Sequence, residues 1–257
     1  MKANYHTHTY RCHHATGEDR EYFESAASRG LEVLGFSDHS PYWFPDGYYS
    51  NFRMRPDEVD GYVNSLESLA EEFKDRFKTY IGYEMEYYPE YFDRAINDVI
   101  KQHRCDYLIL GQHFPKTEIG HPSSGSPHER KEDLVEYVDS VCAAMKTGMF
   151  FYFAHPDVFS FTGDLDFYRA EMKRLCEVAK ETATPLEINL LGLRQGRDYP
   201  REEFWKIAAN VGNRAILGCD AHRPCDLADP DVIDMGQKYA DKFGVEVIEP
   251  HEPKLLK

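Results

Sequence analysis

The chain opens with the stretch Ala3-Asn4-Tyr5-His6-Thr7-His8, which is typical of a short β-strand that ends in two histidines. Residues two positions apart in an extended chain point to the same face, so both imidazoles can reach one site. The sequence Asp220-Ala221-His222 repeats this arrangement after a later strand-like segment. Imidazole nitrogen, alone or with carboxylate oxygen, suits Zn, Fe, Mn or Co better than Ca or Mg.

Short β-rich runs alternate with longer amphipathic stretches, which favours repeated β-α units around a parallel sheet. We expect strands over Ala3 to Thr7, Glu32 to Ser37, Thr79 to Glu84, Tyr107 to Gln112, Phe150 to Ala154, Leu186 to Leu190 and Arg214 to Cys219, with a short edge strand over Val245 to Ile248. Helices are expected over Pro56 to Phe77, Glu129 to Met145, Asp166 to Lys180 and Glu202 to Val211. The turn-rich segments that follow strands should carry substrate specificity; they cover Ser40 to Arg55, Pro115 to His128 and Leu191 to Tyr199.

Metal-ligand side chains follow nearly all of the expected main strands. An isolated His-x-His pair is usually incidental. Side chains at the carboxyl ends of parallel strands, however, face a common mouth when the strands form a barrel. Coincidence at so many strand ends is a poor explanation, and the pattern predicts a multinuclear metal centre. The candidate ligands are His6, His8, His14, His39, Glu84, His113, His155, Asp220 and His222.

Two of these positions have close rivals in the sequence. His14 lies in the loop after the first strand, and its neighbour His13 offers the same chemistry, so spacing alone does not choose between them. Glu86 shares the face of Glu84 if that strand continues, which makes it the main rival for that ligand position. The remaining histidines do not end strands and are expected to be surface or structural residues.

The composition restricts the class of protein. A length of 257 residues is close to the roughly 250 residues of a single α/β barrel, so we expect one domain over residues 1–257. A formal net charge of −15 without a basic stripe argues against a nucleic-acid partner. We find no signal peptide, no apolar run long enough for a membrane span and no Cys-x-x-Cys pair. These features predict a cytoplasmic protein with reduced thiols and no membrane partner, and they leave its oligomeric state open.

The spacing of the candidate ligands resembles that of the polymerase and histidinol phosphatase (PHP) family. The resemblance rests on His6-x-His8, His14, Ser37-Asp38-His39, Gly82-x-Glu84, His113, His155-Pro156 and Asp220-x-His222, and it spans nearly the whole chain. It implies a distorted seven-stranded (β/α)7 TIM-like barrel with three divalent ions, Zn, Mn, Fe or Co, alone or mixed. It also implies that the nine candidates are the ligands, and it favours His14 over His13. Residues 6–14, 82–87 and 187–194 are most similar to stand-alone histidinol-phosphate phosphatases, which implies hydrolysis of L-histidinol phosphate in histidine biosynthesis.

The ligand set suggests how such a site would work. Seven neutral histidines and two carboxylates would leave the ions incompletely neutralised, which favours a small phosphomonoester as the partner molecule. The expected nucleophile is a hydroxide that bridges two ions, with Glu84 as the bridging carboxylate. Arg194 is the preferred phosphate clamp and Arg197 a second candidate, although a loop arginine is as often simply solvated. Asp38 could orient a ligand or pass a proton to the leaving group, and a hydrogen-bonded structural role is an equal alternative.

Two other functions remain open. The first is a PHP phosphoesterase that acts on another small substrate, such as a nucleotide. The second is a non-catalytic, metal-stabilised domain, although structural metal sites are usually closed and four-coordinate. The imidazole and amine of the proposed substrate need aromatic and acidic neighbours, and the loops contain residues of both kinds. Aromatic residues in loops more often serve only to pack the loop against the protein. The candidates are Tyr42, Trp43, Phe44 and Asp157.

Overall fold

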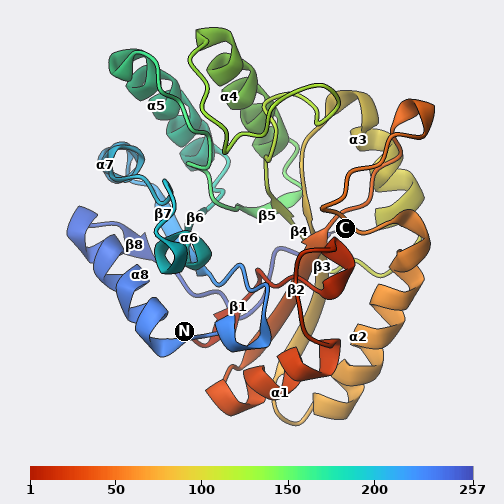
Figure 1. The fold of residues 1–257 in the computed structure, drawn as a ribbon. Coiled ribbons are helices and arrows are strands. Elements are labelled where there is room, and N and C mark those ends of the chain that lie inside the picture. The colour runs from red at the N-terminus through yellow and green to blue at the C-terminus, as the bar shows by residue number, and fades with distance from the viewer. Residues whose placement is uncertain (257) are drawn as a thin grey trace.

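In the computed structural model, which describes residues 1–256, eight strands form one parallel sheet in the order β1 to β8 (Figure 1). The strands are short, and nearly all their residues are buried. Such continuous apolar runs are expected of a parallel sheet that is covered on both faces. Their bounds are β1 (Ala3–Asn4), β2 (Val33–His39), β3 (Lys78–Met85), β4 (Tyr107–Leu110), β5 (Phe150–Phe153), β6 (Leu186–Asn189), β7 (Arg214–Gly218) and β8 (Glu246–Val247).

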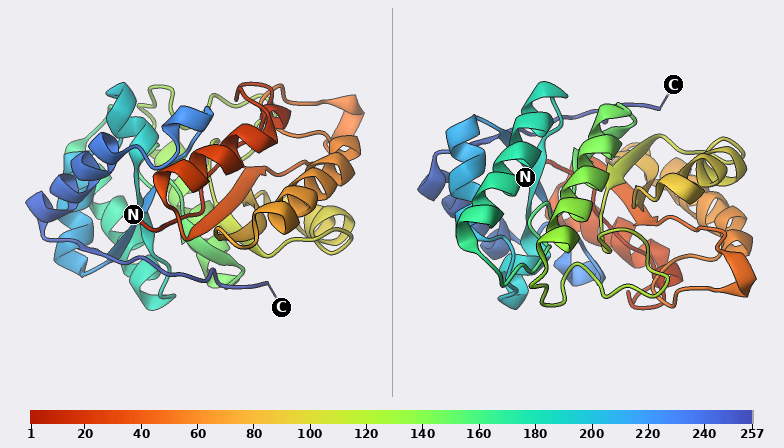
Figure 2. Two further views of the ribbon diagram at one scale, coloured as in Figure 1. Left: turned by 90° about the horizontal axis from the view of Figure 1, so that it is seen from below. Right: turned by 90° about the horizontal axis from the view of Figure 1, so that it is seen from above.

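The helices surround the curled sheet, as Figures 1 and 2 show. The helix α7 has the predicted bounds, α2, α4 and α5 differ from them by a few residues, and α1, α3, α6 and α8 were not predicted. Within residues 1–256, no helix has the length and apolar composition needed to cross a membrane. The helices are α1 (Asp19–Arg29), α2 (Val59–Phe73), α3 (Pro89–Ala95), α4 (Lys131–Lys146), α5 (Leu165–Glu181), α6 (Leu190–Gln195), α7 (Glu202–Val211) and α8 (Pro230–Phe243).

The helix α6 replaces part of the turn-rich segment that was expected after β6. The Asn189 side chain accepts a hydrogen bond from the Gly192 amide and so caps the helix at its start. Gly196 ends the helix in the left-handed conformation, with φ of 62°. Both signals lie in the sequence, but the helix is only six residues long and has too few turns to show a clear periodicity.

The predicted TIM-like arrangement of a curled parallel sheet with surrounding helices is confirmed, but the sheet has eight strands instead of the seven of the predicted barrel, and it stays open. The edge strand β8 pairs with the start of β7, at Arg214 and Ala215. At the other end of β7, Ala221 forms a parallel bridge with Thr7, just beyond β1. The neighbour of β7 therefore changes from β8 to the β1 segment along its length. This exchange places the pairs His6/His8 and Asp220/His222 side by side.

Aromatic residues fill the inside of the curled sheet on the amino-terminal side of the bridge between Thr7 and Ala221. A cluster that includes Tyr5, Tyr80, Tyr107 and Phe151 is buried there, and the Tyr107 hydroxyl donates to the carbonyl oxygens of Tyr5 and Phe36. The C-terminal segment crosses the amino ends of the strands, where Tyr5 donates to the Pro250 carbonyl and the Leu256 amide donates to Asp106. The amino end is thus packed, and the open space lies at the carboxyl end.

Candidate metal centre

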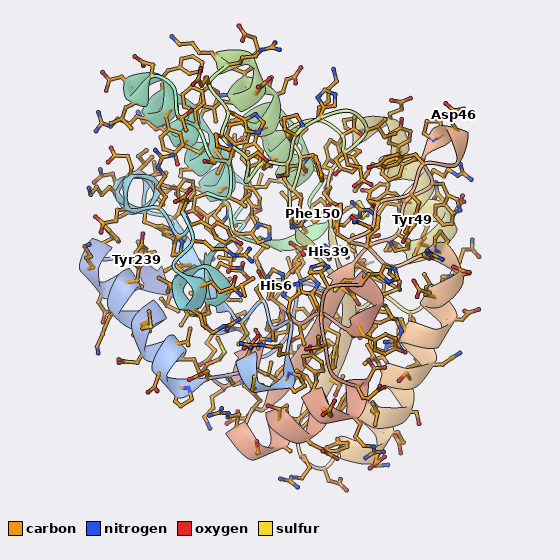
Figure 3. The ribbon with its side chains drawn as sticks, in the orientation of Figure 1. His6, His39, Asp46, Tyr49, Phe150 and Tyr239 are labelled. Carbon is orange, nitrogen blue, oxygen red and sulfur yellow. The ribbon has the colours of Figure 1, made fainter. Side chains whose placement is uncertain are left out.

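The predicted ligands gather around one cavity of about 680 Å³ at the carboxyl ends of the strands. Eight of the nine line it, and His6 lies buried beside them. Figure 3 shows His6 and His39 near the centre of the ring of helices, whereas Asp46 and Tyr239 lie at its periphery. Residues that lie more than 200 positions apart in the sequence therefore share one site, as the strand-end pattern predicted.

Glu84 lies at the centre of this cluster, and its two carboxylate oxygens face different histidines. Oε2 lies 3.5 Å from His6 Nε2, 3.4 Å from His8 Nε2 and 3.1 Å from His39 Nδ1. Oε1 lies 2.7 Å from His155 Nε2 and 3.4 Å from His113 Nε2. A carboxylate in this position can bridge two cations.

The remaining contacts divide the ligands into three neighbouring groups. Asp220 Oδ1 lies 3.5 Å from His6 Nε2 and 3.3 Å from His8 Nε2, so these residues surround Glu84 Oε2. His113 and His155 share Glu84 Oε1 and form a second group. A third group lies toward the rim, where the ligand atoms of its members fall within 4.8 Å of one another: His14, His39 and His222.

Several of these polar atoms are buried without a hydrogen-bond partner among residues 1–256. Buried polar groups in proteins are nearly always paired, because an unpaired group loses its hydration without compensation. Here the unpaired atoms point toward a common volume, and their types are those that bind divalent transition metals. The donor set therefore fits metal ions; the unpaired atoms include His6 Nε2, His8 Nε2, His39 Nδ1, Glu84 Oε2 and Asp220 Oδ1.

The close packing of these ionisable side chains shifts their pKa values in the metal-free protein. Burial alone would raise the pKa of Glu84, but His113, His39, His6 and His155 hold it well below its usual range. Burial alone would lower the pKa of His6, but Glu187, Asp220 and Glu84 raise it to about 10. A metal ion that binds His6 Nε2 would therefore have to displace the second ring proton that these carboxylates favour.

A second set of carboxylates lies behind the candidate ligands. Glu187 Oε1 lies 2.8 Å from His6 Nδ1, and Glu86 Oε1 lies 2.8 Å from His113 Nδ1. An acceptor on one ring nitrogen fixes the proton there and leaves the other nitrogen free to bind metal. With Asp38, these carboxylates make the site more negative than the two-carboxylate count from the sequence suggested.

The sequence analysis did not assign a role to Glu187, although it lies on the one main strand that lacks a ligand at its end. Its side chain is fully buried, and Oε2 accepts hydrogen bonds from the His155 amide and the Asn189 side chain. A charged residue in the middle of a buried four-residue strand was the available signal, since carboxylates are rarely buried without a partner.

Asp38 is buried behind His8 and does not line the cavity formed within residues 1–256. Its Oδ1 lies 3.5 Å from His8 Nδ1 and accepts a hydrogen bond from the His39 amide, whereas Oδ2 accepts from the amide and hydroxyl of Thr9. Of the roles considered from the sequence, these contacts favour the orientation of a ligand over proton transfer to a leaving group.

The structure separates the alternatives that the sequence left open, His13 against His14 and Glu86 against Glu84. His14 Nε2 lies 2.9 Å from His222 Nε2 within the cluster. His13 adopts a positive φ of 63° at the end of the short 3-10 helix Tyr10–Cys12 and lies 3.6 Å from Glu58 on the surface. Glu86 contacts Nδ1 of His113, whereas Glu84 lies near Nε2 on the other side of the same ring. The geometry thus places His14 and Glu84 in the cluster.

Two glycines make room for the carboxylates. A Cβ atom on Gly111, the residue after β4, would overlap with the carboxylate of Glu84, and one on Gly218 of β7 would overlap with that of Glu187. The backbone is also strained at two candidate ligands, because His155 and Asp220 adopt positive φ values of 32° and 46°. Such conformations persist where surrounding contacts enforce them, often at functional sites.

The two arginines face different surroundings. Arg197 lines the cavity, and its Nη1 donates to the Tyr199 hydroxyl over 2.6 Å. Arg194 lies on α6 with Nη2 3.2 Å from Asp226 Oδ2, and it is not among the residues that line the cavity in the described part of the chain. The preference for Arg194 assumed a loop, whereas the helix directs Leu191 and Gln195 toward the cavity instead.

The aromatic residues at the cavity also differ from those expected. Tyr42 and Phe44 pack against Tyr88, and Asp157 accepts a hydrogen bond from the Arg201 amide before α7. The aromatic residues that line the cavity include Phe52, Phe114 and Tyr199, and the ring centroids of Phe52 and Phe114 lie 5.9 Å apart. These two rings offer a flat apolar surface beside His39 and His113.

Comparisons with known proteins find relatives of this chain and of its fold. Residues 4–190 match the family described as PHP domain. A "Probable histidinol-phosphatase" of Deinococcus radiodurans is 29% identical over 86% of this chain and 86% of its own length. A "Probable phosphatase" of Acetivibrio thermocellus is 24% identical over 84% of this chain and 78% of its own. The crystal structure of histidinol phosphate phosphatase from Lactococcus lactis, complexed with zinc, L-histidinol and phosphate, superposes with a TM-score of 0.73 at 21% identity and covers 100% of this chain and 99% of that one.

Proposed function

This chain belongs to the PHP domain family, and from that premise we propose that it is a metal-dependent phosphomonoesterase that hydrolyses L-histidinol phosphate to L-histidinol and inorganic phosphate. The proposal rests on one observation above all. Both oxygens of the buried Glu84 carboxylate face histidine nitrogens, and several atoms around them lack any other partner in residues 1–256. This arrangement fits three divalent ions better than a single structural one.

The candidate ligands would hold the ions in three groups: His6, His8 and Asp220 around Glu84 Oε2, His113 and His155 at Oε1, and His14, His39 and His222 at the rim. When bound, zinc, manganese, iron or cobalt would activate water as the nucleophile and neutralise the charge of the phosphate. Glu187 and Asp38 would hold His6 and His8 in the orientation that binds metal.

The cavity itself supports a small substrate. Its volume of about 680 Å³ is within the range of small-molecule pockets. Arg197 can donate hydrogen bonds to phosphate oxygens from the rim, whereas Phe52 and Phe114 suit the flat imidazole ring of histidinol. Relatives that carry the name histidinol-phosphatase support this choice of substrate over other phosphomonoesters.

A substrate panel tests this proposal. The zinc- or manganese-loaded protein is assayed with L-histidinol phosphate, nucleoside 5′-monophosphates and an activated aryl phosphate, and phosphate release is measured. We expect kcat/KM for L-histidinol phosphate to exceed that for any nucleotide by at least about tenfold, a difference of about 1.4 kcal/mol in transition-state binding. A preference for nucleotides would reject the substrate, and failure to hydrolyse even the aryl phosphate would favour a non-catalytic binding domain.

A further inference from the structure

Arg53 lies where two cavity loops meet the end of β3. It is fully buried, and all five of its N–H groups can be assigned an acceptor. Nε donates to Ser50 Oγ over 2.8 Å and Nη1 to the Ser40 carbonyl over 2.7 Å. The remaining donors reach Glu86, at 3.1 and 3.2 Å, and Glu118. We call these five residues the Arg53 junction.

Glu86 connects the Arg53 junction to a candidate metal ligand, His113. Glu86 Oε1 lies 2.8 Å from His113 Nδ1, and the other ring nitrogen, Nε2, faces Glu84 Oε1 at 3.4 Å. Neutral imidazole carries a single ring proton, and an ionised Glu86 holds that proton on Nδ1. Nε2 of His113 is then left with a lone pair directed toward the cluster.

The charges of the junction do not balance by themselves. One buried guanidinium faces the two buried carboxylates of Glu86 and Glu118, which leaves one surplus negative charge. An uncompensated charge is costly in a buried position. A cation bound to His113 would provide the missing positive charge next to Glu86.

We propose that Glu86 is a positioning residue for His113, and that the Arg53 junction couples cation binding at His113 to order in the loops 40–55 and 115–128. Ser40 and Ser50 belong to the first loop and Glu118 to the second, so one guanidinium ties both to the metal ligand. Both loops contribute to the cavity wall, through Phe52 and Ser123. The inference rests on the proposed metal centre and assigns Glu86 a role distinct from the nine ligands.

Zinc retention tests the positioning role. Wild type, Glu86→Gln and the matched control Glu118→Gln are loaded with zinc and dialysed against increasing chelator, and retained zinc is measured by mass spectrometry. Glutamine keeps the size of the side chain but removes its charge. We expect Glu86→Gln to weaken one class of bound zinc by about tenfold or more. Glu118→Gln should weaken zinc binding clearly less than Glu86→Gln does, because Glu118 contacts Arg53 and not His113.

A double variant separates positioning from general stability. If Glu86 acts through His113, adding Glu86→Gln to His113→Gln should weaken zinc binding little beyond His113→Gln alone. Wild-type zinc retention in Glu86→Gln, or fully additive losses in the double variant, would overturn the positioning role. A wild-type protein that binds no zinc would instead defeat the proposed metal centre itself.

Amide hydrogen exchange tests the coupling and needs no variant to fold. In wild type, zinc should slow exchange in residues 40–55 and 115–128 more than in α8, which is remote from the junction. Where Glu86→Gln folds, this zinc-dependent slowing should be largely lost while the remaining zinc stays bound. Equal exchange in the two loops with and without zinc would overturn the coupling.

Discussion

Glu187 accepts a hydrogen bond from His6, with 2.8 Å between Glu187 Oε1 and His6 Nδ1, and both side chains are fully buried. The same carboxylate accepts a hydrogen bond from the His155 amide through Oε2. One residue in the middle of β6 therefore fixes the ring of one candidate ligand and the backbone of another.

The first prediction follows from this contact. Replacing Glu187 by Gln should weaken metal binding by about 10- to 100-fold, because the substitution removes the charge that orients His6 and raises its basicity. Metal content after dialysis against a chelator would measure the loss. Glu181→Gln, at the exposed end of α5, is a matched control that should bind metal like wild type. Full metal occupancy in Glu187→Gln would refute this role.

The second prediction concerns pH. Neighbouring carboxylates raise the pKa of His6 from 6.5 to about 10 in the metal-free protein. This contribution to metal-free stability is therefore fully present below pH 6.5 and is lost as the pH rises through about 10. Metal binding must displace the same proton, so affinity should rise by about tenfold per pH unit for each proton released between pH 6 and 9.

Competition with a chromophoric chelator at several pH values would measure this slope, with correction for the protonation of the chelator. Proton release on metal addition in weakly buffered solution gives an independent count. An affinity that does not change with pH over this range would show that His6 binds no proton that competes with metal.

The third prediction concerns the space beside Glu84. Gly111→Ala should displace the Glu84 carboxylate, since the added Cβ would overlap with it, and should lower both metal content and phosphatase kcat/KM by at least about tenfold. Gly61→Ala is the control, because no atom within 4 Å would meet its Cβ. In the first turn of α2, that change should stabilise the protein by up to about 0.5–1 kcal/mol without affecting metal content. Normal metal binding in Gly111→Ala would contradict the tight packing.

The sequence predicted the strands well because each is a buried β-rich run between amphipathic helices. It also identified side chains that converge, because these lie at strand ends or just beyond them, and the geometry of a parallel sheet brings such positions together. Glu84 lies near the end of β3, and His6, His155 and Asp220 follow β1, β5 and β7. These features depend mainly on local composition and on strand direction.

Other features depend on how elements meet in space, which the local pattern does not specify. The role of Glu187 depends on the curl of the sheet, which brings the Glu187 side chain on β6 within 2.8 Å of His6. The number of strands and the open edge depend on β7 pairing with β8 at one end and with the β1 segment at the other. The direction of Arg194 depends on the phase of α6, a helix that was not expected.

The last prediction separates the two arginines. Arg197→Ala should raise KM for the phosphomonoester or lower kcat/KM by at least about tenfold, because Arg197 lines the cavity and its guanidinium can bind phosphate oxygens. Arg194→Ala should lower the thermal midpoint, since Asp226 loses a partly buried counter-ion, while KM stays near the wild-type value. Steady-state kinetics and thermal unfolding of both variants test this difference. A large rise in KM for Arg194→Ala with normal kinetics for Arg197→Ala would restore Arg194 as the phosphate clamp, and would mean that α6 turns toward the cavity when substrate binds.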